Sequence, residues 1–266
     1  MLGATAGRTT LHGEGLQHND GHSQLFAQAT PNLMAYDPAF AFETAVIVRD
    51  GLRRMLVDNQ DVFYYITLYN ENCVMPAMPK GKNIEDGIVR GLYRFKTAAK
   101  GRIKAQIMAS GPMVNLALQA QAILAEDYDV GADVLSATSY QQLFRDGRAV
   151  ERGNRLHPGA KPKVPFVAQV IDQAEGPVIA VSDWVQEVPS LIHRFVPRRF
   201  VPLGTNGFGR SDTREALRAH FEVDAAAIVV TVLHTLMLEG AMPAKMVQAA
   251  LKKYGIDPER QDPMLA

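Results

Sequence analysis

The sequence IKAQIMA at residues 103–109 indicates the architecture of this chain. It is a largely apolar run that ends at Ser110-Gly111-Pro112, a pattern typical of a buried strand followed by a turn. Residues 114–127 come next, with alanine and leucine at helical spacing, so a helix is expected there. Further short strands are predicted at residues 132–139, 177–181 and 200–203, the last at a sheet edge. This alternation predicts an α/β fold with a mainly parallel sheet flanked by helices.

A second group of elements precedes this one. Residues 31–36 favour a short strand, and residues 38–57 carry apolar side chains at three- and four-residue spacing, as an amphipathic helix does. Asp37 is expected to cap that helix, with Pro38 at its first position. Residues 62–69, VFYYITLY, are β-branched and aromatic, which predicts a strand in the centre of a parallel sheet.

The segment 75–82, MPAMPKGK, separates the two groups. Its two prolines, one glycine and two lysines are typical of a domain boundary. We therefore divide the chain into residues 1–77 and residues 78–266.

Several polar segments are interpreted from their local chemistry. Residues 146–165 are rich in Arg, Gly, Asn and Pro, and we expect a solvated loop. Residues 204–212, GTNGFGRSD, place glycines before a helix and so admit a phosphate-binding reading, but they lack the lysine and spacing of a phosphate loop. Ser211 or Asp212 is instead expected to cap a helix at 214–221, with Glu215 completing a capping box. The last helices are expected from Asp224 to residue 239 and from residue 243 to 254.

Composition excludes several classes of partner. Twenty-eight basic residues balance twenty-eight acidic ones, so there is no electrostatic case for nucleic acid or an anionic membrane. Cys73 is the only cysteine, which excludes an intrachain disulfide and favours the cytoplasm. The N-terminus lacks the pattern of a secretory signal. The most apolar run, residues 225–238, is too short to span a bilayer and is expected to be a buried helix.

The segment GRTTLHGEGLQHNDGHS at residues 7–23 concentrates reactive groups. Glu14 lies between two glycines, with His12, His18, His22 and Asp20 nearby. Glycine lets the backbone approach a ligand, and a carboxylate with imidazoles can move protons near neutral pH. A polar surface turn is the alternative. Glu14, His18 and His22 are also conceivable metal ligands, but Gly21 between the two histidines argues against the rigid helix that such a site would need.

Four long sequence segments add to the interpretation of residues 7–23 as a functional loop. The segment 7–23, YDPAFAFETAVIVRDGLRRM at 36–55, YYITLYNEN at 64–72 and LGTNGFGRSDTREALRAHFEVD at 203–224 occur in this order. Together they closely resemble pyruvate dehydrogenase of the homodimeric type, the thiamine-diphosphate-dependent first component of the pyruvate dehydrogenase complex. The resemblance implies a C-terminal portion of such an enzyme: residues 1–77 as the tail of a pyrimidine-binding domain and residues 78–266 as a transketolase-like C-terminal domain.

The same resemblance assigns candidate site residues. His18 matches the active-centre histidine of the family's GLQH and is the first candidate for catalysis and substrate binding. Glu14 matches the acid of GEG, and it is expected to position His18 or take part in proton transfer. His22, in DGHS, is a supporting substrate-binding residue. Asn19 stands where many members have an acid, so the charge around His18 differs from theirs.

The resemblance also implies cofactors and partners. Thiamine diphosphate and magnesium are expected to be held by segments upstream of residue 1, with no cofactor-binding or metal-binding residue in this chain. The expected partners are a second identical subunit, the lipoyl-bearing acetyltransferase component and pyruvate. The alternative is a non-catalytic α/β module for dimer contact and support, and the isolated chain is expected to have no turnover.

Overall fold

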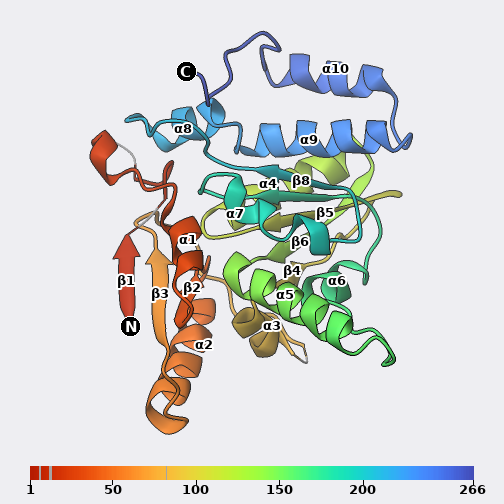
Figure 1. The fold of residues 1–266 in the computed structure, drawn as a ribbon. Coiled ribbons are helices and arrows are strands. Elements are labelled where there is room, and N and C mark those ends of the chain that lie inside the picture. Colours follow the sequence, from red (N-terminus) through yellow and green to blue (C-terminus); the bar gives the residue numbers. More distant parts are fainter. Residues whose placement is uncertain (6, 12–13, 82) are drawn as a thin grey trace.

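The computed structural model describes residues 1–5, 7–11, 14–81 and 83–266. Two sheets organise these residues, a three-stranded one near the N-terminus and a five-stranded one in the rest of the chain (Figure 1). The α/β class and the mainly parallel pairing predicted from sequence are confirmed.

The smaller sheet is parallel and has the order β1-β3-β2. Its middle strand, β3, is the predicted central strand. Helix α2 lies beside it and continues into one π-helical turn. The bounds are β1 Leu2–Thr5, α1 Ser23–Phe26, β2 Leu33–Tyr36, α2 Ala41–Leu52, the π turn Arg53–Val57 and β3 Phe63–Leu68, with 3-10 turns at Leu16–His18 and Ala27–Ala29.

The larger sheet has the order β4-β6-β5-β7-β8, in which only β4 runs antiparallel to its neighbour. Strand β5 matches the predicted strand at both ends, and β8 lies at the edge as expected. Strand β4 has no counterpart among the predicted elements. The bounds are α3 Ile84–Arg90, β4 Tyr93–Lys96, β5 Ile103–Ala109, β6 Val130–Ser136, β7 Val178–Val181 and β8 Phe200–Leu203.

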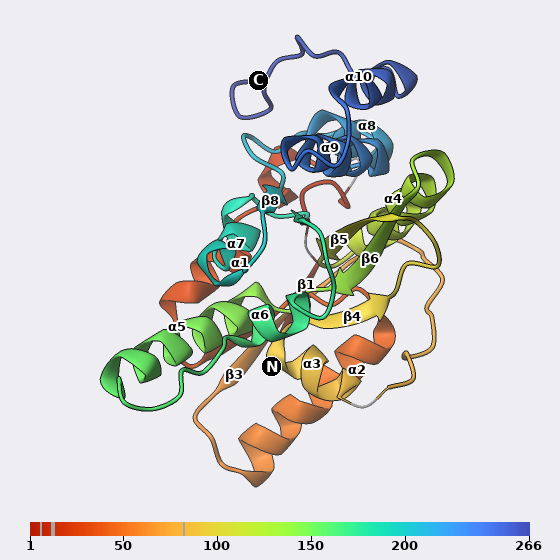
Figure 2. The ribbon, with the colours of Figure 1, turned by 90° about the vertical axis from the view of Figure 1, so that its right-hand side faces the viewer.

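Helices cover both faces of the larger sheet (Figure 2). Helices α4 and α9 cover one face, with α10 packed outside α9, and α5, α6 and α7 cover the other. The bounds are α4 Met113–Asp127, α5 Tyr140–Leu156, α6 Phe166–Ile171, α7 Glu187–Ser190, a 3-10 turn His193–Phe195, α8 Arg214–His220, α9 Ala225–Leu238 and α10 Ala244–Lys253.

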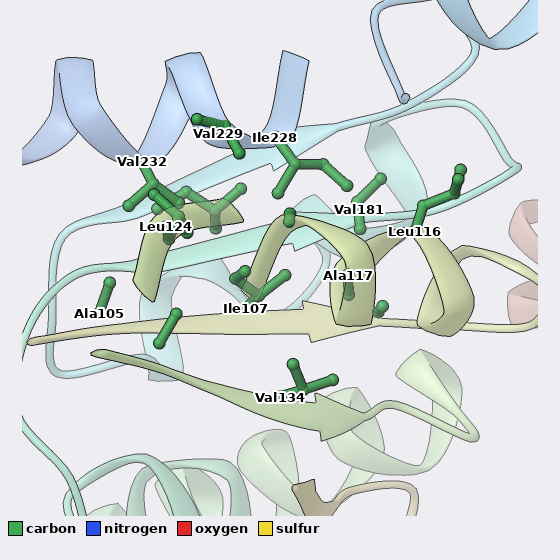
Figure 3. Close-up of a cluster of buried hydrophobic side chains, with 14 of the residues drawn as sticks. Ala105, Ile107, Leu116, Ala117, Leu124, Val134, Val181, Ile228, Val229 and Val232 are labelled. Carbon is green, nitrogen blue, oxygen red and sulfur yellow. The ribbon is translucent and has the colours of Figure 1, made fainter. Parts of the chain in front are cut away.

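The core follows from the alternation of side chains along the strands. In β5, Ala105 and Ile107 face α4 and α9, while Met108 faces α5 and α6. Val232 of α9 enters the first of these layers, which Figure 3 shows. Strands buried on both faces read as continuous apolar runs, and this is why β5 is recognisable in the sequence.

Residues 214–238 are long and apolar enough to cross a membrane by length and composition alone. In the structure this stretch is two helices, α8 and α9, separated by a turn in which Glu222 has a positive φ of 58°. Asp224 caps α9, as predicted, by accepting from the N–H of Ala227 at 2.7 Å. Ile228 and Val232 of α9 pack against the sheet, so the apolar character of this helix is accounted for by the core.

Asp37 is not the helix cap that the sequence suggested. Helix α2 begins after Phe40, and Asp37 is buried, accepting from Thr67 Oγ1 at 2.6 Å, from Tyr69 Oη and from Trp184 Nε1 at 3.0 Å. The carboxylate that starts α2 is that of Glu43, whose Oε2 accepts from the N–H groups of Ala39 and Phe40. Asp37 therefore joins the two sheets rather than capping a helix.

Two other expectations are wrong. Residues 146–165 are not one solvated loop, because α5 continues to Leu156. The helix is difficult to recognise in the sequence because most of its residues are polar. Only a narrow stripe of its surface is buried, including Leu143 and Gly147. The cap of α8 is Thr213, whose side chain accepts from the N–H of Ala216 at 3.2 Å, and not Ser211 or Asp212.

Candidate functional site

Glu14 and His18 form a pair on the outer part of the glycine-rich segment. His18 ends the 3-10 turn Leu16–His18, and its Nδ1 lies 3.0 Å from Oε2 of Glu14. Both side chains are open to solvent, 62% exposed for His18 and 46% for Glu14. His12 and Gly13, which the sequence placed in the same loop, lie outside the described residues.

Asn19 and Asp20 turn the chain back toward the protein. The Asn19 side chain is buried and donates from Nδ2 to the carbonyl of Arg210 at 3.0 Å, so it anchors the loop. Asp20 Oδ1 accepts from the N–H groups of His22 at 2.9 Å and Ser23 at 3.0 Å. Asp20 thereby satisfies free donors at the start of α1 and fixes the backbone of His22.

Arg8 is buried behind His22, with 3% of its surface exposed. Its Nη1 donates to the carbonyls of Thr205, at 2.9 Å, and Gly207, and its Nη2 lies 3.3 Å from Nδ1 of His22. A Cβ at Gly21 would lie 2.5 Å from Nη2 of Arg8, so only glycine leaves room for this guanidinium. Burial lowers the pKa of Arg8, an effect opposed by the charges of Asp20 and Asp183.

Thr9 and Thr10 are fully buried and bind the carboxylate of Asp183. Asp183 Oδ1 accepts from the N–H of Thr9 at 3.0 Å and from its hydroxyl at 2.6 Å, and Oδ2 accepts from the Thr10 hydroxyl at 2.8 Å. Burial raises the pKa of Asp183, while the bonds from the two threonines and the charge of Arg218 oppose the rise. Asp183 follows β7, so the larger sheet positions the start of the glycine-rich segment.

Two arginines of α8 complete this anchor. Arg214 donates from Nε to the carbonyl of Thr10 at 2.9 Å. Arg218 lies four residues later on the same helix face and donates from Nε to Thr9 Oγ1 at 3.4 Å. Arg218 also makes a bidentate ion pair with Glu71, at 3.0 and 2.5 Å. Glu71 follows β3, so α8 fixes two segments of the N-terminal region at once.

The structure therefore brings some sequence candidates together and separates others. Glu14 meets His18, but His22 meets Arg8 instead of joining that pair. The segment 204–212 directs two carbonyl oxygens at the guanidinium of Arg8. A phosphate-binding loop would instead direct N–H groups at an anion. Sequence reasoning missed Arg8, Asp183, Arg214 and Arg218 as parts of the site. No sequence pattern signalled them, because their contacts join residues up to 209 positions apart.

A cavity of about 400 Å³ adjoins His22. Its other walls are mostly apolar and include Leu25, Val185, Phe208 and Met264. Within the described ranges, no three His, Cys, Asp or Glu side chains are grouped to hold a metal ion. The donor set present here, one imidazole at an apolar cavity and one exposed carboxylate–imidazole pair, does not fit a diphosphate with its magnesium ion.

Comparison with known proteins identifies the family. Residues 1–76 match the model of the pyruvate dehydrogenase E1 component middle domain, and residues 91–224 match that of the transketolase-like TK C-terminal domain. A solved transketolase variant from Pichia stipitis has the same fold, with a TM-score of 0.64 and 18% identity over 90% of this chain and 30% of that chain. The chain thus belongs to the transketolase-like family of α/β proteins.

Its nearer relationships are more specific. The chain is 48% identical to the pyruvate dehydrogenase E1 component of Pseudomonas aeruginosa, over 99% of this chain and 30% of that protein. It is 47% identical to that of Escherichia coli, over 100% of this chain and again 30% of the relative. Within the transketolase-like family, the chain is therefore related along its whole length to pyruvate dehydrogenase E1 components and spans about 30% of their length.

Proposed function

We propose that this chain is the C-terminal portion of a pyruvate dehydrogenase, which decarboxylates pyruvate oxidatively and transfers the acetyl group to a lipoyl group. Relatives at 47–48% identity along the whole chain support this, as does their greater length. The single observation in the structure that carries the proposal is the exposed Glu14–His18 pair on a firmly anchored loop.

In this function the chain supplies part of the active centre. His18 is the catalytic residue that meets substrate, Glu14 positions its ring through the bond at 3.0 Å, and His22 is a second contact for substrate. Thiamine diphosphate and magnesium would be held by segments of the longer protein, because the residues described here do not fit them.

The domain division belongs to the same proposal. A boundary near residue 77 is supported by the ends of the two family matches, at residue 76 and residue 91. Between β3 and α3 the described chain forms no helix or strand. A second identical subunit and a lipoyl-bearing acetyltransferase would be the partners, in the cytoplasm.

One observation favours the alternative, a non-catalytic support module, for the chain on its own. Its described residues offer no site for the diphosphate, while its core is complete enough to bury residues such as Trp184 and Leu124 fully. We therefore expect the isolated chain to have no turnover.

The test uses the longer protein and follows pyruvate-dependent acetylation of a lipoyl domain. His18→Asn is expected to lower kcat/KM at least about 100-fold, the usual contribution of a positioned proton-transfer group. His234→Asn, at an exposed position on α9, is the matched control and should leave the rate unchanged. Equal activity of the two variants would contradict the role of His18. Turnover by the isolated 266-residue chain would refute the fragment proposal.

A further inference from the structure

We propose that the loop holds its two histidines in opposite tautomers, so that His18 offers a bare Nε2, a proton acceptor, and His22 offers an Nε2–H donor. Arg8 is then a positioning residue that acts through His22, as Glu14 acts through His18. The inference rests on the proposed function for its consequence, but the tautomers follow from contacts within the chain.

The state of His18 follows from the chemistry of its neighbour. An ionised carboxylate has only acceptor sites, so the Nδ1 that lies 3.0 Å from Glu14 Oε2 must carry the hydrogen. In the neutral ring the other nitrogen then has a free lone pair. The His18 side chain is 62% exposed, so this lone pair is accessible to a second molecule.

The state of His22 is fixed by the opposite chemistry. A guanidinium has only donors, so the Nδ1 that lies 3.3 Å from Arg8 Nη2 must accept. The hydrogen of the neutral ring is therefore on Nε2. His22 therefore has the opposite tautomer to His18, because the Arg8 cation lies at its Nδ1 where the Glu14 anion lies at Nδ1 of His18.

Contacts within the chain hold Arg8 and the backbone of His22 in place. Arg8 is held by the carbonyls of Thr205 and Gly207 and by the close approach of Gly21, where a Cβ would lie 2.6 Å from the guanidinium carbon. The His22 ring stacks on Phe26, with ring centroids 6.1 Å apart and 20° between planes. Its backbone N–H donates to Asp20 Oδ1 at 2.9 Å, which holds the backbone at this residue.

The two histidines have different surroundings, since His22 lines a cavity and His18 lies in the exposed pair with Glu14. His22 forms one wall of the cavity of about 400 Å³, whose other walls are mostly apolar but include the polar side chains of Glu187 and Asn206. An Nε2–H donor at the edge of this cavity is suited to bind the ketone oxygen of a small oxo acid. His18 is then the group that takes a proton, and His22 is the one that stabilises negative charge.

Histidine side-chain nitrogen NMR tests the assignment without substrate. The protein is labelled with ¹⁵N at histidine, studied at a pH where the rings are neutral, and assigned with His18→Asn and His22→Asn. We expect a protonated Nδ1 for His18 and a protonated Nε2 for His22. Glu14→Ala should move only His18 toward the mixture of a free imidazole, and Arg8→Lys should move only His22.

Arg8→Lys keeps a charge and a donor for the carbonyls of Thr205 and Gly207, but it removes the separate nitrogen, Nη2, that lies against the His22 ring. Arg214→Lys is the matched control, since it changes another arginine that holds the same segment without touching His22. The indole N–H signal of Trp184, bound to Asp37, reports folding in each sample.

The same tautomer for both histidines in the unmodified protein would overturn the inference, whatever the variants do. So would an Arg214→Lys effect on His22 equal to that of Arg8→Lys. In the longer enzyme, Arg8→Lys is expected to reduce kcat/KM about tenfold, which corresponds to about 1.4 kcal/mol. If the tautomers are as assigned and the enzyme does not act on pyruvate, the proposed function fails and the inference on Arg8 stands.

Discussion

The beginning and the middle of the glycine-rich segment differ sharply in burial. Residues 8–11 are buried and bound to Asp183, Arg214 and Thr205, whereas the side chains of residues 16–18 are exposed. The buried part makes contacts that stability depends on, and the outer part carries the groups suited to chemistry. Substitutions in the buried part should therefore affect folding, and substitutions in the outer part should affect activity.

Asp183→Ala should have the largest effect on stability. It leaves the Thr9 N–H and the hydroxyls of Thr9 and Thr10 without their buried acceptor, so we expect a loss of about 3 kcal/mol or more in the free energy of unfolding. Urea unfolding followed by Trp184 fluorescence measures it.

The control for this variant is Asp172→Ala, which removes an exposed carboxylate that lies 3.5 Å from Nη2 of Arg198. It should change the free energy of unfolding by less than about 0.5 kcal/mol. Equal losses for the two variants would break the contrast between the buried and the exposed part.

Arg218→Leu should rank second. The side chains of Arg218 and Glu71 are only 10% and 24% exposed, so removing the guanidinium leaves a largely buried carboxylate unpaired, at a cost of about 2 kcal/mol. Arg194→Leu, which breaks an exposed pair with Glu151, should cost less than about 1 kcal/mol. Chemical unfolding of both variants decides whether the α8 contact is part of the anchor.

Asp183→Asn should alter the pH dependence of stability more than stability itself. Burial raises the pKa of Asp183 in the folded protein above its ordinary value of 3.8. The native state then binds the proton of the Asp183 carboxyl group more tightly than the unfolded state does. The contribution of this protonated carboxyl group to the free energy of unfolding is fully present below pH 3.8 and is lost as pH rises through the folded pKa. The stability of the wild type relative to the variant should therefore fall with rising pH in this window. A rise instead would show that the bonds from Thr9 and Thr10 outweigh burial.

Glu14→Ala should have the smallest effect on folding. Glu14 is 46% exposed, and among the described residues its side chain bonds to the exposed His18 alone, so the change in free energy of unfolding should stay within about 0.5 kcal/mol. Thermal unfolding checks this. A loss comparable to that of Asp183→Ala would make Glu14 part of the anchor, and the buried and outer parts would then not differ in their effect on folding.

The sequence predicted the elements whose burial leaves a clear pattern. Strands β5 and β8 were located at both ends, because apolar runs bounded by turn residues have few other interpretations. Strand β4, YRFK, was missed since it is short and only partly buried, and the second half of α5 was taken for a loop because few of its residues are apolar. Asp37 was taken for a cap because Asp-Pro is a local signal, while its buried partner Trp184 lies 147 residues away.

The candidate site divides in the same way. Glu14 and His18 are close in sequence, so their pairing was within reach of sequence reasoning, and their catalytic roles stay predictions. Arg8 and Asp183 were not, because an isolated arginine or aspartate has no distinguishing pattern. The contact between Thr9 and Asp183 joins residues 174 positions apart, and only the folded chain shows it.

The measurement that tests the central claim most directly is amide hydrogen exchange along residues 7–23. The Thr9 N–H, bound to Asp183 at 3.0 Å, should exchange only when the whole protein unfolds, while the amides of Leu16 and Gln17 should exchange nearly as fast as those of an unstructured peptide. Comparable rates for Thr9 and Leu16 would contradict an anchored base with an open outer part.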